Sequence, residues 1–272
     1  MRPLIAMALF ALMLAGCSKS VDPKTKSFVY PLAMGNRWVY DYQTITDFRG
    51  KKPNDTVTYS STVEVVQVDT ILPGICSYTL RATSTFPDSL APLPAKQYVN
   101  LPDGMYLRHS STGTSMVLPK QYGVRSPVMF RGRQYENLQT LLTTLIEPPE
   151  LATSSSSGAA DSYSLILPYP QSLGQRWTRA QVDDDQVIGL DMKIIGSTTA
   201  KNSAGSFECH VIQWIYVPPV EDLDVADFTS AEGLIQRRIE ARNLIMTSYE
   251  FPYGGDTADV VSTYQLTSFH IH

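Results

Sequence analysis

Tyr-Pro-Leu-Ala-Met-Gly-Asn-Arg-Trp, residues 30–38, returns 139 residues later as Tyr-Pro-Gln-Ser-Leu-Gly-Gln-Arg-Trp, residues 169–177. Tyr, Pro, Gly, Arg and Trp recur at the same spacing, and we call the two copies the Tyr–Trp segments. In each copy we expect the proline to favour an extended tyrosine before it, the glycine to permit a turn, and the tryptophan to begin a core-facing strand. The repeat predicts an internal duplication.

The residues after each Tyr–Trp segment alternate in polarity, as half-buried β-strands do. Trp38, Tyr40 and Tyr42 share one face by this period of two, and the chain as a whole contains 15 tyrosines. We therefore predict a mainly β protein made of two related antiparallel sheet units, over 28–130 and 163–272. Each unit would be a curved sheet, a sandwich or a half-barrel. Both two separate domains and one fused structure are compatible with the pattern.

One stretch between the units has helical rather than strand periodicity. It predicts an amphipathic helix over 134–147, inside a connecting region of helix and Ser-rich linker that spans 131–162. Five apolar residues form the expected stripe of that helix: Leu138, Leu141, Leu142, Leu145 and Ile146. Pro148 and Pro149 would end it. A second, shorter helix is compatible with the acidic residues 220–228.

The N-terminus has the features of an export signal. Residues 1–16 carry one arginine and a short apolar run, too short to span a bilayer as a stable helix. The run ends in Leu14-Ala15-Gly16-Cys17, which resembles the lipobox of bacterial lipoproteins. That resemblance implies cleavage before Cys17 and attachment of diacylglycerol to its thiol, with acylation, such as palmitate, on the new amine. The alternative is an ordinary secretory signal with a chance cysteine. Residues 17–27 then form a polar tether.

The combination is similar to a broad group of uncharacterised bacterial lipoproteins with Pro-Leu-x-x-Gly-x-x-Trp segments. In this sequence the matching residues are Pro31, Leu32, Gly35 and Trp38, then Pro170, Gly174 and Trp177, with Gly233-Leu234 and Tyr264, Leu266 and Ser268 near the C-terminus. The second copy departs from the pattern, with Gln171 in place of the leucine. The resemblance implies an antiparallel β protein of the bacterial cell envelope. Ser18, in place of aspartate, implies an outer-membrane rather than inner-membrane anchor. The resemblance implies no established activity.

Charge and motifs exclude several classes of function. The net charge of −4 and the pI near 5.6 argue against a nucleic-acid partner. The sequence contains no nucleophile elbow, zinc-protease motif, phosphate loop or dinucleotide fingerprint. His270 and His272 could chelate a metal, but solvated imidazoles are the simpler interpretation, and Asp183–Asp185 is similarly interpreted as a solvated turn. We therefore predict no catalytic residue, no metal and no cofactor.

Two pairs of residues are candidates for special roles. Cys76 and Cys209 occupy apparently matching places in the two units, so they could pair as a disulfide or remain two separate buried thiols. Trp214 and Tyr216 lie on one strand face and could form an exposed platform for a glycan or a protein partner. His210 follows Cys209 directly, so it should point to the opposite face, which argues against a Cys–His nucleophilic pair.

The function that this sequence favours is a non-catalytic binding or interaction module, held at the membrane through the lipid on Cys17. Its partner would be an envelope protein, a glycan or an apolar ligand. Three alternatives stay open: an envelope hydrolase, a carrier of apolar ligands, and a structural component of an envelope complex. A carrier would need a continuous apolar cavity in the sheet interior.

Overall fold

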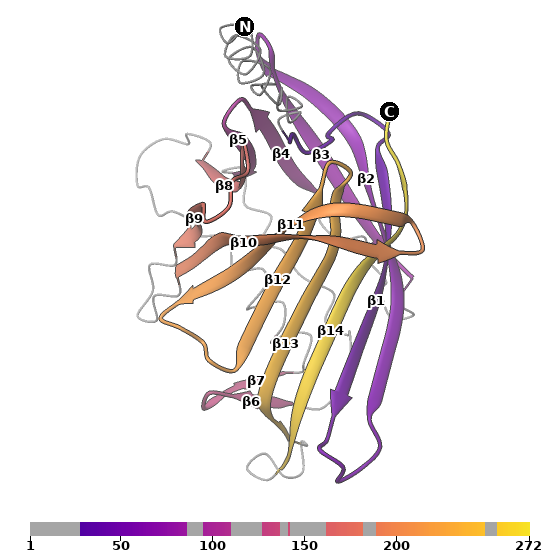
Figure 1. Cartoon of the computed structure of the whole chain (residues 1–272), viewed down its shortest axis with the longest axis vertical. Helices are drawn as coiled ribbons and strands as arrows, with labels where there is room; N and C mark the ends of the chain where they lie inside the picture. Colours follow the sequence, from indigo (N-terminus) through magenta and orange to yellow (C-terminus); the bar gives the residue numbers. More distant parts are fainter. Residues whose placement is uncertain are drawn as a thin grey trace, which may run out of the picture.

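The computed structural model describes residues 28–85, 95–109, 127–136, 141, 162–181, 189–247 and 255–272. The described residues are organised as one mainly antiparallel β-sheet that curves into a nearly closed, barrel-like shape (Figure 1). Within these ranges, no helix has both the length and the hydropathy that crossing a membrane would require. The predicted tether, the signal segment and Cys17 lie outside the described residues.

Eight strands precede the second Tyr–Trp segment: β1 (Arg37–Asp47), β2 (Asp55–Leu72), β3 (Ile75–Ser84), β4 (Lys96–Leu101), β5 (Gly104–His109), β6 (Val128–Phe130), β7 (Arg133–Tyr135) and β8 (Ser162–Pro168). Six follow it: β9 (Arg176–Gln181), β10 (Gly189–Asn202), β11 (Gly205–Val217), β12 (Leu223–Ser230), β13 (Gly233–Thr247) and β14 (Gly255–His270). The main path through the sheet runs β8-β5-β4-β3-β2-β1-β14-β13-β12-β11-β10-β9. Strand β6 pairs with β13 and with β7 beside that path.

The strand order places the two halves of the chain side by side. Strands β1 to β5 and β8 form one meander, and β9 to β14 form another, joined where β1 pairs with β14. Strands β8 and β9 are the two ends of the path, so the sheet curves back on itself without a ladder between them. The two sequence stretches that we treated as separate units thus contribute to one continuous sheet.

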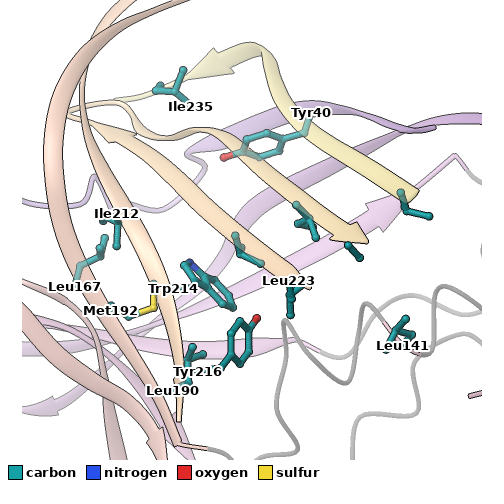
Figure 2. Close-up of a cluster of buried hydrophobic side chains, with 14 of the residues drawn as sticks. Tyr40, Leu141, Leu167, Leu190, Met192, Ile212, Trp214, Tyr216, Leu223 and Ile235 are labelled. Atoms are coloured by element: carbon teal, nitrogen blue, oxygen red, sulfur yellow. The ribbon is translucent and has the colours of Figure 1, made fainter. Parts of the chain in front are cut away.

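The core lies on the inner face of this curved sheet (Figure 2). Figure 2 shows Leu190 and Met192 of β10 and Trp214 of β11 gathered on one side, with Tyr40 of β1 on a neighbouring part of the same side. The strands are half-buried because side chains alternate between this core and the outside. On β1, for example, Trp38 and Tyr40 are buried while Asp41 is exposed.

The predicted helix over 134–147 is not part of the described structure. Its start is wrong, since Arg133–Tyr135 is strand β7, paired with Val128–Phe130. A strand forms there because Arg131 and Gly132 have positive φ and turn the chain back on itself. Most of the remaining predicted helix lies outside the described residues, apart from Leu141, which is fully buried as its place in the apolar stripe requires.

The prediction of a short helix over 220–228 is also wrong. Most of that range belongs to β12, in which Leu223, Val225 and Asp227 are buried with a period of two. The acidic residues misled the interpretation because Asp222 precedes the strand and Asp224 is exposed near its start, whereas Asp227 is buried. Pairing with β11 and β13 on both sides overrides the weak local preference.

The tip of the β10–β11 hairpin lies across the neighbouring strands in Figure 1. At the tip, Phe207 and Cys209 are buried, whereas further along β11 the buried residues are Ile212, Trp214 and Tyr216. The buried face changes because the tip packs on β14 through its opposite side, where Phe207 meets Phe269 at a ring-centroid distance of 5.9 Å. Both faces of β11 therefore carry buried apolar residues, one face at the tip and the other further along the strand.

Candidate functional site

A row of five polar and aromatic side chains crosses the inner face on five neighbouring strands. We call it the inner row: Tyr59 of β2, Tyr42 of β1, Tyr264 of β14, Arg237 of β13 and Asp227 of β12. Each member lies directly opposite the next in the strand register. Because directly opposed residues point to the same face, the row is a continuous band of side chains on the inner face.

The tyrosine end of the inner row is a stack of rings. Tyr42 stacks on Tyr59 with ring centroids 4.4 Å apart, and it meets the tilted ring of Tyr264 at 4.1 Å. Tyr40 also stacks on Tyr264, with ring centroids 4.2 Å apart. Tyr42, Tyr59 and Tyr264 are only partly buried, so the rings offer aromatic surface on the inner face.

The other end of the inner row is an ion pair. Arg237 donates from Nε to Oδ1 of Asp227 at 2.6 Å and from Nη2 to Oδ2 at 2.9 Å, which is a bidentate contact. The Asp227 side chain is 9% exposed and that of Arg237 is 21% exposed. Burial alone lowers the pKa of Arg237, but the charge and hydrogen bonds of Asp227 outweigh it and raise that pKa above its usual value. Arg237 is therefore a permanent cation whose side chain is largely, but not fully, buried.

Trp214 connects this ion pair with β9. Its indole Nε1 donates to Oδ2 of Asp227 at 3.1 Å. The guanidinium of Arg237 lies 4.6 Å from the Trp214 ring centroid, and that of Arg179 lies at the same distance. Two cations thus contact one indole ring, an arrangement in which the ring's negative face stabilises positive charge in a partly desolvated place.

Trp214 and Tyr216 do not form an exposed platform. Their side chains are 3% and 4% exposed, and both point into the core (Figure 2). The alternation along β11 was interpreted correctly, but the sheet curves so that this face becomes the interior. Trp38 and Trp177 are buried as predicted, at 0% and 8% exposed.

Burial changes the acidity of the tyrosines around the inner row. Desolvation raises the pKa of Tyr30 to about 12, against a backbone hydrogen bond from Leu234 that lowers it. It likewise raises the pKa of Tyr42 and of Tyr264 above the ordinary value, while Tyr42 donates a hydrogen bond to the Tyr264 oxygen. These phenols are neutral hydrogen-bonding groups at neutral pH and carry no nucleophilic phenolate.

Cys76 and Cys209 are free thiols, so the suggested disulfide does not form. The reason is a shift of one residue between the two hairpins. Val65 lies opposite Leu80 as Ile194 lies opposite Ile212, and counting along each ladder from these pairs places Cys209 at the position of Ser77. A one-residue shift moves a side chain to the other face of a strand, so Cys76 and Cys209 point to opposite faces of their hairpins. Burial raises the pKa of Cys209 to about 11, which makes it an unreactive thiol.

The histidines do not assemble a site either. His210 contacts Ser197 across the ladder at 3.4 Å, on the face away from Cys209, as predicted. His270 and His272 have rings 4.5 Å apart at the end of β14, and the His272 backbone N–H donates to Asn36 Oδ1 at 2.9 Å. Among the side chains that the structure describes, no three His, Cys, Asp or Glu residues group closely enough to hold a metal ion. Asp183–Asp185 lies outside the described residues.

Sequence reasoning missed the inner row, although two signals for it were present. The number of tyrosines indicated only a preference for strands. Tyr264 served only as one of the residues that match the group of bacterial lipoproteins. Asp227 was assigned to an acidic helix. Asp227 lies on the same strand face as the buried Val225 and Thr229. An acidic residue at such a position in an alternating pattern is the signal that could have identified a buried charge.

No family model and no curated protein matches the chain. Two crystal structures resemble it. One is a protein of Parabacteroides distasonis provisionally described as a lipoprotein, with 12% identity, a TM-score of 0.40, and coverage of 90% of this chain and 99% of the other. The second is a protein of Bacteroides fragilis provisionally described as an exported protein with a YmcC-like fold, with 11% identity, a TM-score of 0.39 and the same coverage.

Proposed function

We propose that this protein is a lipid-anchored bacterial cell-envelope protein, held at the outer membrane, that binds a ligand or partner on the inner face of its sheet without catalysing a reaction. The observation that carries the binding role is the inner row: partly exposed, stacked tyrosines beside a buried ion pair. Burying a bidentate ion pair costs desolvation free energy, and an apolar pair of similar volume is often as stable or more so. Its presence beside accessible aromatic rings supports a role in recognition.

The anchoring part of the proposal rests on Leu14-Ala15-Gly16-Cys17. It is tested by fractionating cells that produce the wild-type chain or a Cys17→Ala variant. Wild type should pellet with outer membranes and incorporate labelled palmitate, and the variant should do neither, because several acyl chains are needed for lasting attachment. Palmitate labelling that persists in the variant would contradict the assignment of Cys17.

The binding part is tested by placing a photo-crosslinking phenylalanine at Tyr59, a partly exposed member of the inner row, in living cells. The matched control carries the same group at Tyr163 on β8, whose side chain is 44% exposed. A defined adduct at position 59 that is absent at position 163 supports binding at the inner face, and its mass separates a protein partner from a small apolar ligand. Equal labelling at both positions, or none at position 59, would overturn the proposal.

A carrier of apolar ligands is the second candidate, because Tyr42, Tyr59 and Tyr264 provide the partly exposed aromatic surface that an acyl chain or ring could contact. Against it stands the packing of the interior by Trp38 and Trp177. An adduct of lipid mass at position 59 would favour the carrier over the interaction module.

A further inference from the structure

A polar hollow lies on the outer face of the sheet, over the junction between the two meanders. It has a volume of about 450 Å³ and is bordered by strands β1, β2 and β14 and by Thr85, which follows β3. That volume is within the range of small-ligand sites. Tyr42 and Tyr59 of the inner row also border the hollow from their own strands, whereas the side chains of the other strand residues that line it alternate with them and point away from the core.

Six side chains form the floor of the hollow as two cross-strand rows of three. One row joins Ser60, Asp41 and Gln265, and the second joins Thr58, Gln43 and Thr263, with the β1 residue in the middle of each. Tyr42 of β1 lies between Asp41 and Gln43 and points to the inner face instead. The two rows therefore present a regular grid of amide, hydroxyl and carboxylate groups to solvent.

Hydrogen bonds among backbone groups and short side chains hold Thr85, Ser60 and Asp41 in place at one edge of the hollow. The Thr85 N–H donates to the Ser60 carbonyl at 2.9 Å, and the Ser60 N–H donates to Thr85 Oγ1 at 3.0 Å. The Ser60 hydroxyl in turn donates to Asp41 Oδ1 at 2.5 Å. These bonds hold the hydroxyls and the carboxylate in place before any ligand arrives, which lowers the entropy that binding must overcome.

The chemistry of the lining selects the class of ligand. Amides and hydroxyls each donate and accept hydrogen bonds, which is what a dense set of ligand hydroxyls requires. The lining residues include one carboxylate and no lysine or arginine, so the hollow disfavours phosphates, carboxylates and acidic polymers. The nearest guanidinium across the ladder, that of Arg238 opposite Thr263, is paired with Glu240. We propose that this outer hollow binds a neutral carbohydrate chain, independently of the function proposed for the inner face.

The test uses the mature lipidated protein in detergent micelles and immobilised neutral hexasaccharides: maltohexaose, cellohexaose, mannohexaose and N-acetylchitohexaose. Hexagalacturonate is the anionic comparison. At least one neutral chain should bind, and hexagalacturonate should bind more weakly. The double variant Gln43→Ala/Gln265→Ala should lose at least about tenfold in affinity, because it removes an amide from each row. Gln213→Ala, on β11 and outside the hollow, should leave the affinity unchanged.

Three results would overturn the inference: no neutral hexasaccharide binds, hexagalacturonate binds as tightly as the best neutral chain, or the double variant binds as wild type does. Hydrogen exchange gives a second measurement that does not depend on the variants. Saturating oligosaccharide should slow exchange in β1, β2 and β14 only. Slowing confined to β12 and β13 would instead assign the ligand to the ion-pair end of the inner row. Because Tyr59 borders both surfaces, the double variant separates them: an inner-face adduct at Tyr59 should persist in it, whereas loss of the adduct would assign that adduct to the hollow.

Discussion

The two Tyr–Trp segments share a glycine turn but lead into different junctions of the sheet. The first leads into β1, which pairs along its whole length with β14. The second leads into β9, which ends the strand path opposite β8 without a ladder between them. We call these the β1–β14 junction, which is closed, and the β8–β9 junction, which is open.

The two segments share the backbone of the glycine turn, although the Tyr169–Pro170 peptide bond is cis and the Tyr30–Pro31 bond is not. Gly35 and Gly174 both have a φ of 81°, a left-handed conformation that glycine tolerates best. The Gly35 N–H donates to the Val65 carbonyl at 3.0 Å, and the Gly174 N–H donates to the Ile194 carbonyl at 2.8 Å. In both hairpins a bulge follows at the next residue, between Val65 and Gln67 and between Ile194 and Gly196. These correspondences support our proposal that the chain arose by internal duplication.

The differences lie in what each segment holds together. Trp38 Nε1 donates to the Glu232 carbonyl at 2.7 Å, in the turn between β12 and β13. Trp177 Nε1 donates to the Ile166 carbonyl at 3.2 Å, so at the open junction a side chain makes the connection that a ladder makes at the closed one. The comparison teaches that one local motif can serve two roles: it supports a paired junction in one half, and it bridges an unpaired one in the other.

Replacing the two tryptophans by alanine should give the largest effects and separate the two roles. Trp38→Ala removes a side chain with no exposed surface and should lower the free energy of unfolding by about 3–5 kcal/mol. Trp177→Ala should cost less, about 2–4 kcal/mol, because the residue keeps 8% exposure and its hydrogen bond is longer. Urea unfolding followed by circular dichroism measures both. A larger loss for Trp177 would mean that the open junction limits stability.

Much of this architecture could be predicted from the sequence, and the reasons are local. The burial of the tryptophans and the alternation on β1 were both predictable, because period-two burial depends on nearby residues. The closed junction was not predictable, since Tyr42 and Tyr264 are opposed only after the whole chain has folded.

The sequence analysis missed the inner row and wrongly suggested a disulfide between the two cysteines for the same physical reason. Asp227 carries one local signal, its apolar-phase position, but it is the curvature of the sheet that turns the face of Arg237 and Asp227 into the interior. Cys76 lies one residue away from the position in its hairpin that matches Cys209. Short repeated motifs cannot reveal such an offset, because the loops differ in length between the two halves. Register decides which face a side chain occupies, and register is a long-range property.

The residue after each proline is the clearest local difference between the segments. Leu32 is 7% exposed in the core, whereas its counterpart Gln171 has an amide whose nitrogen and oxygen are both buried without a hydrogen-bond partner among the described groups. Gln171→Leu should raise the free energy of unfolding by about 1–2 kcal/mol, since an unpaired buried amide is costly. The matched exchange Leu32→Gln should lower it by about 2–4 kcal/mol. If Gln171→Leu destabilises the protein, the amide makes a hydrogen bond to a group outside the described residues.

High pH should weaken the closed junction through its tyrosines. The folded-state pKa of Tyr30 is raised from 10.0 to about 12, mainly by burial. A raised pKa means that the stabilisation is complete below pH 10 and is lost as the pH rises from 10 towards 12. The loss from Tyr30 alone approaches about 3 kcal/mol above pH 12. Urea unfolding at pH 8 to 12 should therefore show a steep fall, and Tyr30→Phe, which cannot ionise, should show a shallower one. Parallel curves would contradict the assignment to Tyr30.

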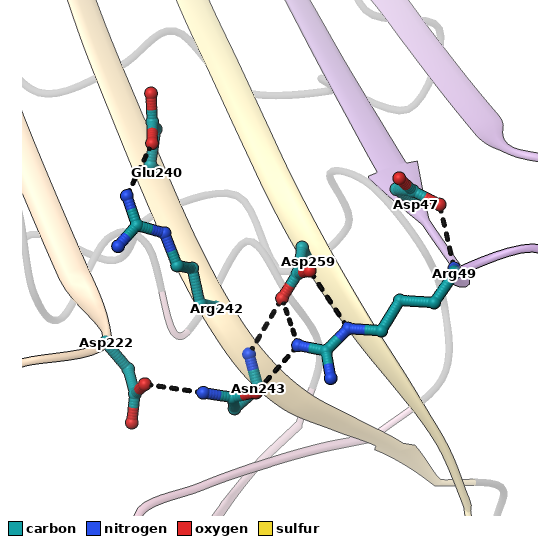
Figure 3. A network of polar contacts seen from close by, with 7 residues as sticks. All are labelled: Asp47, Arg49, Asp222, Glu240, Arg242, Asn243 and Asp259. Atoms are coloured by element: carbon teal, nitrogen blue, oxygen red, sulfur yellow. Dashed lines mark hydrogen bonds and ion pairs between the residues drawn. The ribbon is translucent and has the colours of Figure 1, made fainter.

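The smallest effect should come from a polar network at the far end of the closed junction (Figure 3). There Arg49, in the turn after β1, donates to both Asp259 oxygens, at 3.0 and 2.6 Å, and from Nη2 to Asn243 Oδ1 at 2.6 Å. Asn243 Nδ2 continues the network to Asp222 at 2.7 Å. The hydrogen bonds from Arg49 lower the pKa of Asp259 below 3.8.

Asp259→Asn should lower the free energy of unfolding by only about 0.5 kcal/mol, because the pair is solvent-exposed and screened. The effect should have a definite pH dependence. A lowered pKa stabilises the fold above the ordinary pKa of 3.8, and the contribution disappears as the pH falls through the folded-state value. Wild type and variant should therefore differ at pH 7 in low salt and converge near pH 2 or in 1 M NaCl. A difference that survives both conditions would mean that Asp259 acts by positioning the Asn243 backbone, whose N–H it accepts at 3.0 Å, and not through its charge. The closed junction would then be held at this end by the shape of the β13 bulge.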